Sequence, residues 1–154
     1  MKKKLTLLLL LIVIIFITGC TSNKSKTVID SPKFIESATN NSFTVSDNSD
    51  NYKEQNYIIS STIAKIDDLV IEFVIYDSED TAKKAQEQQI DNFNLLKSPN
   101  SFVNKSSGKN YYHYSMTSNN YYMISTRVEN TLIFSKVKEE DKDKVENVIN
   151  ELNY

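Results

Sequence analysis

Two residues that could support nucleophilic or metal-binding chemistry, Cys20 and His113, occur only once each in the sequence. A zinc site needs several histidine or thiolate ligands, and the chain has no further ones to complete it. Serine and aspartate are abundant, but no Gly-x-Ser-x-Gly turn marks the nucleophile of a Ser-His-Asp triad. With only two glycines, the chain also lacks a phosphate-binding glycine loop. We therefore expect no catalytic residues, no metal site and no cofactor, and we do not expect an enzyme.

The residues that lead to Cys20 resemble a bacterial lipoprotein signal. Three lysines, Lys2–Lys4, precede an apolar segment, Leu5–Ile17, that is too short to span a bilayer. The sequence Ile17-Thr18-Gly19-Cys20 is similar to the lipobox, which usually has Leu at the first of these positions. The resemblance implies that the Cys20 thiol receives a diacylglycerol and that the Gly19–Cys20 bond is cut. The alternative is an ordinary cysteine at the end of a signal anchor.

The lipobox would divide the chain into three parts. Residues 1–19 would be a signal peptide that is removed, residues 20–30 a lipidated cysteine with a polar tether, and residues 31–154 a single globular domain. Each buried methylene stabilises membrane binding by about 0.8 kcal/mol, so the two acyl chains of a diacylglycerol would anchor the protein durably. We therefore expect the mature protein to be lipid-anchored at the extracellular face of the cell membrane.

Charge and length restrict the partners of the mature chain. The sequence has 18 basic and 20 acidic residues, and removal of the three lysines in the signal leaves 15 basic residues. A net-negative domain gains nothing from nucleic acid or from an anionic lipid surface. About 135 residues suffice for one domain with a real core but not for a two-lobed transporter binding protein. We expect a monomer that does not bind nucleic acid.

The hydrophobic pattern predicts an α+β fold. Residues 57–66 and 69–76 alternate as strands around the turn Asp67-Asp68, and further short polar turns separate the strands after residue 102. Helices are expected from Ser31, as N-cap, and in two apolar stripes at 79–96 and 139–152. We predict a single antiparallel sheet of about six strands in hairpins or a meander, with the helices packed on one face. Whether this sheet is built from a duplicated helix-plus-meander unit is left open by the sequence.

A tyrosine-rich block is the most unusual feature of the domain, and it reads NYYHYSMTSNNYYMIS. Aromatic residues stabilise cross-strand pairs, which is one explanation. The other is a binding face, because tyrosine combines a flat apolar ring with a polar tip. Alternation along each strand predicts that Tyr111, His113, Tyr121 and Met123 form such a face for a peptide, glycan or protein, and that Tyr122 belongs to the core.

The chain resembles a family of small, uncharacterised lipoproteins of low-GC Gram-positive bacteria. Besides the lipobox, the resemblance rests on three stretches, FIESATNNSFTVSD, LVIEFVIYDSEDTAKKA and YYMISTRVENTLIFSKVKEEDKDKVENVINELNY. The family usually ends in Leu-Gly-Tyr, where this chain has Leu152-Asn153-Tyr154. The resemblance implies a location and a fold, and it supplies no catalytic residues.

These observations favour a non-catalytic binding module, anchored at the cell surface, that engages a cell-surface protein, peptide or glycan. One alternative is an accessory or immunity-type inhibitor of a membrane enzyme. Another is a hydrolase whose Ser, His and Asp side chains are dispersed in the sequence.

The lipobox makes a direct prediction for Cys20→Ala. Without the thiol no diacylglycerol can attach, so cells should accumulate an unlipidated precursor that does not incorporate a palmitate analogue. Metabolic labelling followed by purification measures this. Equal labelling of the wild-type and Cys20→Ala proteins would contradict the lipobox assignment.

Overall fold

The computed structural model describes residues 24–154, so Cys20 and the expected signal peptide lie outside the described residues. This part of the chain forms an α+β fold with one open antiparallel sheet of seven strands and three α-helices. The elements are, in chain order, α2 (Ser31–Asn40), β1 (Thr44–Asp47), a 3₁₀ turn η2 (Ser49–Tyr52), β2 (Ile58–Ile66), β3 (Leu69–Tyr76), α3 (Glu79–Asn94), β4 (Phe102–Ser107), β5 (Tyr111–Ser118), β6 (Tyr121–Val128), β7 (Thr131–Lys138), a second 3₁₀ turn η3 (Glu139–Asp141) and α4 (Lys142–Glu151).

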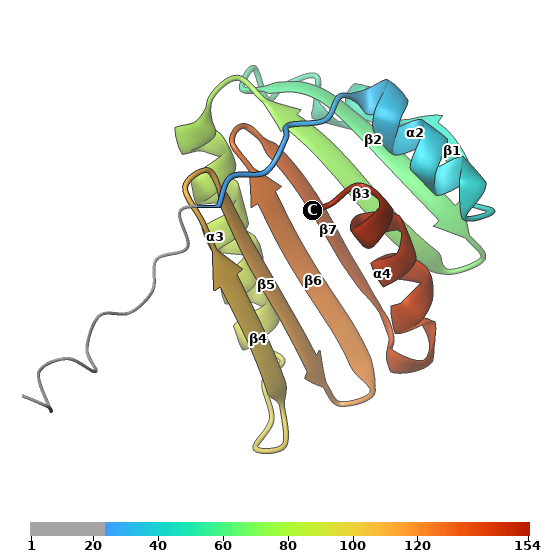
Figure 1. Cartoon of the computed structure of the whole chain (residues 1–154), viewed down its shortest axis with the longest axis vertical. Helices are drawn as coiled ribbons and strands as arrows, with labels where there is room; N and C mark the ends of the chain where they lie inside the picture. Colours follow the sequence, from blue (N-terminus) through green and yellow to red (C-terminus); the bar gives the residue numbers. More distant parts are fainter. Residues whose placement is uncertain (1–23) are drawn as a thin grey trace, which may run out of the picture.

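Two meanders lie side by side in the sheet, whose strand order is β1-β2-β3-β7-β6-β5-β4 (Figure 1). The first meander follows α2 and the second follows α3, and they join where β3 pairs with β7, with Phe73 opposite Ile133. The sheet therefore has seven strands where the sequence predicted about six. The short segment after α2 forms β1, the edge strand of the first meander.

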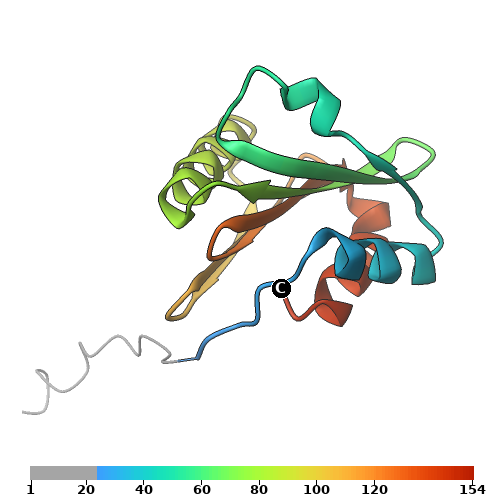
Figure 2. The same ribbon diagram turned by 90° about the horizontal axis from the view of Figure 1, so that it is seen from above.

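Helices cover both faces of the sheet, with α2 and α4 on one side and α3 on the other (Figure 2). Phe34 of α2 stacks on Phe73 of β3 with ring centroids 5.2 Å apart, in the core cluster that also contains Val145 and Val148 of α4. The opposite face packs on α3 in two clusters, one of Val74, Tyr76, Ala82 and Leu132, the other of Phe93, Tyr114, Met116 and Met123.

The sequence predicted that the helices pack on one face of the sheet. This holds for α2 and α4, whereas α3 packs on the opposite face. The physical reason is visible in β3, which carries apolar side chains on both faces. Leu69, Ile71 and Phe73 are buried on one side, and Val74 and Tyr76 on the other. A strand with two apolar faces needs a covering layer on each.

Tight polar turns set the register of the hairpins. Asp67, Asn119, Asn120 and Glu129 all adopt positive φ, between 49° and 64°. The right-handed twist of the flanking strands favours such turns, and short polar residues tolerate them best. The turns expected at Asp67-Asp68 and Asn119-Asn120 are confirmed.

The first helix begins one residue earlier than the sequence predicted. The N-cap is Asp30 and not Ser31, because the Asp30 carboxylate accepts the capping hydrogen bond from the Lys33 amide at 3.0 Å.

Residues 24–29 are bound to the domain and do not form the tether expected from the sequence. The Lys26 amide donates to the Asn110 side-chain oxygen, and the Asn110 amide group donates back to the Lys26 carbonyl, both at 2.9 Å. The Ile29 amide donates to the Tyr154 hydroxyl at 3.2 Å. Val28 and Ile29 pack against the main core cluster. We call this segment, residues 24–29, the N-terminal strap.

The strap should contribute measurably to stability. Full burial of a Val or Ile side chain contributes about 1.5–3 kcal/mol, and both strap residues are partly exposed, so together we expect about 2–3 kcal/mol. A chain that begins at Asp30, which keeps the α2 cap, should melt roughly 10 °C below the chain that begins at Cys20. Thermal unfolding followed by circular dichroism measures this. Equal melting temperatures would show that the strap does not contribute to the core.

Candidate functional site

The predicted tyrosine face does not form, because its four residues divide between the two faces of the sheet. His113 pairs with Thr126 on the side of α2 and α4, whereas Tyr121 pairs with Ser118 and Met123 with Met116 on the side of α3. A hairpin with a two-residue turn pairs odd-numbered residues of one strand with even-numbered residues of the next. Tyr111 and His113 therefore share a face with Tyr122 and not with Tyr121.

Burial separates the four residues further. Met123 has no exposed surface and belongs to the cluster under α3, so it cannot contact a partner. Tyr111 and His113 are half-buried, with the Lys26 ammonium of the strap 4.9 Å from the Tyr111 ring centroid. Tyr121 alone is exposed, at 44%. Tyr122 lies in the core as predicted and donates from its hydroxyl to Glu146 at 3.0 Å.

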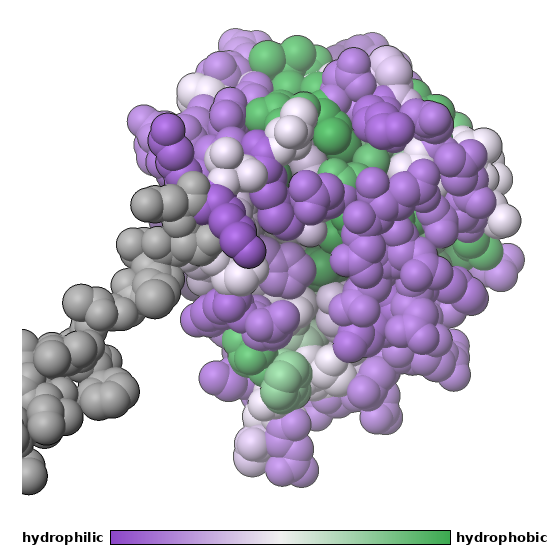
Figure 3. All heavy atoms as spheres, in the orientation of Figure 1, coloured by the Kyte–Doolittle hydropathy of each residue, from purple (hydrophilic) through white to green (hydrophobic). Residues whose placement is uncertain are grey.

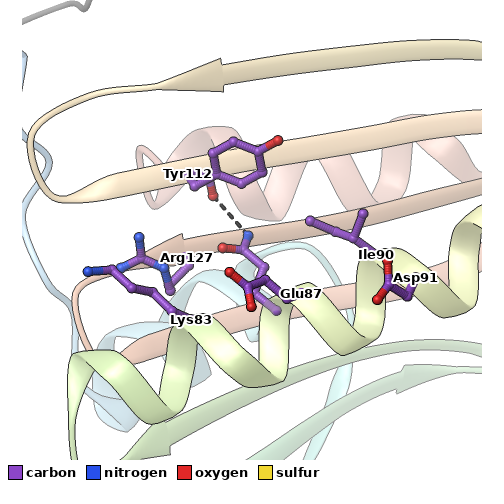
Figure 4. Close-up of a pocket in the computed structure, with 7 residues that line it drawn as sticks. Lys83, Glu87, Ile90, Asp91, Tyr112 and Arg127 are labelled. Carbon is purple, nitrogen blue, oxygen red and sulfur yellow. Dashed lines mark hydrogen bonds between the residues drawn. The ribbon is translucent and has the colours of Figure 1, made fainter.

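A cavity of about 580 Å³ lies between α3 and β5, on the face opposite to α2 and α4 (Figure 4). Its size is within the range of small-molecule sites. Seven residues line it, of which five come from α3 and one each from β5 and β6: Lys83, Gln86, Glu87, Ile90, Asp91, Tyr112 and Arg127. We call this hollow the α3–β5 cavity.

Gln86 fixes the helix beside this cavity. Its side chain is buried, and the amide nitrogen donates to the Tyr112 carbonyl at 3.0 Å and to the Ser125 carbonyl at 3.1 Å. The dashed line in Figure 4 marks the first of these bonds. One side chain of α3 thus holds both β5 and β6. This explains why a polar residue occupies the centre of an otherwise apolar helical stripe.

Arg127 is a buried charged residue on the cavity wall, with 5% of its surface exposed. Its Nη1 donates to the Glu79 carboxylate at 3.1 Å and to the Glu129 carbonyl at 3.0 Å. Its Nε is buried and has no hydrogen-bond partner. An unsatisfied buried donor costs about 1–3 kcal/mol, more for a charged group. The Nε–H is therefore an unsatisfied donor, and it is enclosed by protein rather than open to the cavity.

Charge is distributed unevenly along the cavity. Lys83 and Arg127 share one carboxylate, because the Lys83 ammonium also lies 3.2 Å from Glu79. The hydrogen bond from Lys83 and the charges of both cations hold the pKa of the Glu79 carboxyl below its usual value. Glu87 and Asp91 follow one and two turns further along α3, on the same side of the helix (Figure 4). The cavity thus has a cationic end and an acidic end.

This arrangement offers charge and hydrogen bonds to a ligand. Among residues 24–154, no group of three or more His, Cys, Asp or Glu side chains is placed to hold a metal ion. Likewise, none of the helices in this range is long and apolar enough to cross a membrane.

Two features of the sequence point to this site, although neither could be interpreted from the sequence alone. Arg127 is the only arginine in the chain, where every other strongly basic residue is lysine. Gln86 interrupts the apolar stripe of α3. Neither feature shows that Arg127 lines the same cavity as Lys83, from which it is separated by 44 residues in the sequence.

Comparison with known proteins found no matching family model, no matching curated protein and no matching solved structure.

The lone histidine predicts a pH dependence of stability. Burial lowers the pKa of His113, the nearby Lys26 charge lowers it further, and Glu146 opposes them. The unfolded chain therefore binds a proton at a higher pH than the folded domain, so the free energy of unfolding should decrease as the pH falls from 7.5 through about 6.5. Urea unfolding at pH 7.5, 6.5 and 5.5 measures this. His113→Asn should flatten the dependence, and an unchanged slope in that variant would contradict the assignment.

Proposed function

We propose that this protein is a lipid-anchored module at the extracellular face of the cell membrane that binds a small ligand without catalysing its conversion. The anchor would be a diacylglycerol on Cys20. The lysine cluster, the short apolar segment and the Ile-Thr-Gly-Cys ending support it. The ligand would occupy the α3–β5 cavity, in place of the tyrosine face that the sequence suggested.

One observation carries the proposed binding site, namely the Arg127 guanidinium, a nearly buried cation on the cavity wall. Arginine presents its donors in a planar fork that matches a carboxylate. Lys83 adds a second cation, and the single carboxylate of Glu79 is shared between the two. An anionic group of the ligand is therefore favoured at this end.

The acidic end of the cavity specifies the rest of the ligand. Glu87 and Asp91 lie about 6 and 12 Å along the helix axis from Lys83, at 1.5 Å per residue. An ammonium group at this end would balance a carboxylate at the other. A free amino acid or a short peptide with both termini unblocked has this pattern of charges.

A second candidate function, binding to a membrane protein as an accessory or inhibitor, is supported by a group of exposed apolar residues. Leu95 is 83% exposed, Phe102 72% and Tyr121 44%. All three lie at the same end of the sheet. Leu95 and Tyr121 are on the side of α3, because Leu96 accepts a hydrogen bond from Ser118 and Ser118 pairs with Tyr121, whereas Phe102 pairs with Thr117 and faces the side of α4. Hydrophobic residues are visible in the region where β4 begins (Figure 3).

Calorimetric titration with blocked and unblocked peptides tests the proposed site. The chain from Cys20 to Tyr154 should bind unblocked Ala-Ala, and amidation of the peptide carboxylate should weaken binding at least tenfold, since a hydrogen bond to a charged group contributes about 1.5–3 kcal/mol. Arg127→Gln should weaken binding of the unblocked peptide by a similar factor.

Lys84→Gln provides the matched control, because Lys84 is exposed on α3 and does not line the cavity. This variant should bind like the wild type. The site assignment would fail if amidated and unblocked peptides bound equally well to the wild-type protein, or if none of the peptides bound. The first comparison needs no variant, so it remains decisive even if Arg127→Gln unfolds.

A further inference from the structure

A second hollow lies on the other flank of α3, between this helix and the segment that leads from η2 into β2. Its volume is about 220 Å³, and side chains from the end of β3 and the start of β7 form its floor. Figure 2 shows η2 and α3 on the same side of the sheet. We call this hollow the α3–η2 groove. We propose that it binds one ring of an uncharged saccharide.

The lining of the groove contains no charge that could select an ionic ligand. Of residues 24–154, eleven line the groove and none of them is charged. Four carry side-chain amides (Gln55, Gln88, Gln89 and Asn92), four are aromatic and three are aliphatic. A charged ligand would lose its water here without gaining a partner of opposite charge, which is costly. The groove therefore favours an uncharged ligand.

The amides come mainly from one flank of α3. Ala85, Gln88, Gln89 and Asn92 recur at the spacing of one helical face, whereas the flank that lines the α3–β5 cavity carries charges. Within residues 24–154, the side chains of Gln88, Gln89 and Asn92 make no hydrogen bond. Each amide offers two donors and a carbonyl acceptor. Adjacent hydroxyls of a sugar ring, which both donate and accept, complement such groups.

Tyr76 adds an unused donor on the floor of the groove. The residue is buried, with 5% of its surface exposed, and it lines the groove. Its hydroxyl makes no hydrogen bond within residues 24–154, yet it is not among the polar atoms that the protein encloses completely. The hydroxyl therefore opens into the groove. Burial raises the pKa of this hydroxyl, and Tyr52 and Glu72 raise it further, so the group stays protonated and can donate to a ligand.

The aromatic walls are held in place before any ligand binds. The Tyr52 hydroxyl donates to the Glu72 carboxylate at 2.8 Å, and the Tyr57 hydroxyl donates to the Gln55 side-chain oxygen at 2.9 Å. The second bond leaves both N–H donors of Gln55 for a ligand. Tyr57 and Phe134 are partly exposed, and their flat apolar rings suit the C–H face of a sugar. Groups that are already fixed need not be ordered on binding.

Size and position favour a sugar ring over a peptide. Drug-sized ligands occupy pockets of about 300–1,000 Å³, and the α3–η2 groove is smaller. A peptide strand is commonly recognised through main-chain hydrogen bonds at a sheet edge. The groove instead lies over β3 and β7 in the middle of the sheet, and side chains supply its hydrogen-bonding groups.

Titration of the chain from Cys20 to Tyr154 with four methyl glycosides, followed by NMR, tests the proposal. Methyl β-glucoside and methyl N-acetyl-β-glucosaminide are uncharged, methyl β-glucuronide carries a carboxylate, and methyl β-glucosaminide carries an ammonium group. At least one uncharged glycoside should shift the side-chain amide resonances of Gln88, Gln89 and Asn92. It should bind about threefold or more tightly than either charged glycoside, because the groove offers no partner for a charge.

Tyr76→Phe removes only the hydroxyl that opens into the groove. Affinity for the glycoside that binds should fall about two- to tenfold, the range expected for one hydrogen bond between neutral groups. The melting temperature should stay the same, because the hydroxyl has no hydrogen-bond partner among residues 24–154. Gln88→Ala should weaken binding by a similar factor. Lys84→Ala, which should bind like the wild type, is the matched control, since Lys84 lies one turn before Gln88, is exposed and lines neither hollow.

The proposal would be overturned if neither uncharged glycoside bound, if a charged glycoside bound equally well, or if both variants bound like the wild type. Tighter binding of the blocked peptide acetyl-Ala-Ala-amide at the same resonances would overturn it too, by assigning the groove to a peptide. The glycoside comparison needs no variant. It concerns the flank of α3 opposite to the α3–β5 cavity, so its outcome is independent of the Ala-Ala titration.

Discussion

The pairing of β3 with β7 is the constraint on which the other features of the domain depend. It places β4 at the far edge of the sheet, four strand spacings from β3, or about 19 Å. The chain must cross that distance between the two strands, and the 16 residues of α3 span about 24 Å. The helix runs back along the sheet to the end where β4 begins, and it packs on β7, β6 and β5 (Figure 1). This crossing brings its polar residues against Arg127 and Tyr112 and creates the α3–β5 cavity.

The contact between α3 and the sheet divides into two apolar ends and a polar middle. Ala82 and Phe93 anchor the two ends of the helix, and Gln86 and Arg127 occupy the space between them. Apolar side chains of similar volume would serve stability as well or better, because burying a charge carries a desolvation penalty that a single partner rarely offsets. A nearly buried arginine on a cavity wall is easier to understand as part of a binding site than as part of a core.

Local features of the fold could be predicted from the sequence, and long-range pairings could not. The turns at Asp67-Asp68 and Asn119-Asn120 depend on neighbouring residues, so their sequence signals were sufficient. The β3–β7 pair joins residues about 60 apart, and no local signal specifies it. Two wrong predictions, the tyrosine face and the polar tether, could have been avoided. A two-residue turn places His113 and Tyr121 on opposite faces of the sheet, and the adjacent apolar residues Val28 and Ile29 argue against a polar tether.

The central claim is that the Arg127 guanidinium awaits a ligand, and one NMR signal reports on it directly. Because the sequence contains a single arginine, the spectrum contains a single arginine Nε–H resonance. This proton should exchange slowly with solvent, as a buried group does, and its shift should move to saturation as unblocked Ala-Ala is added. Rapid exchange, or a resonance that does not respond to the peptide while others do, would contradict the account.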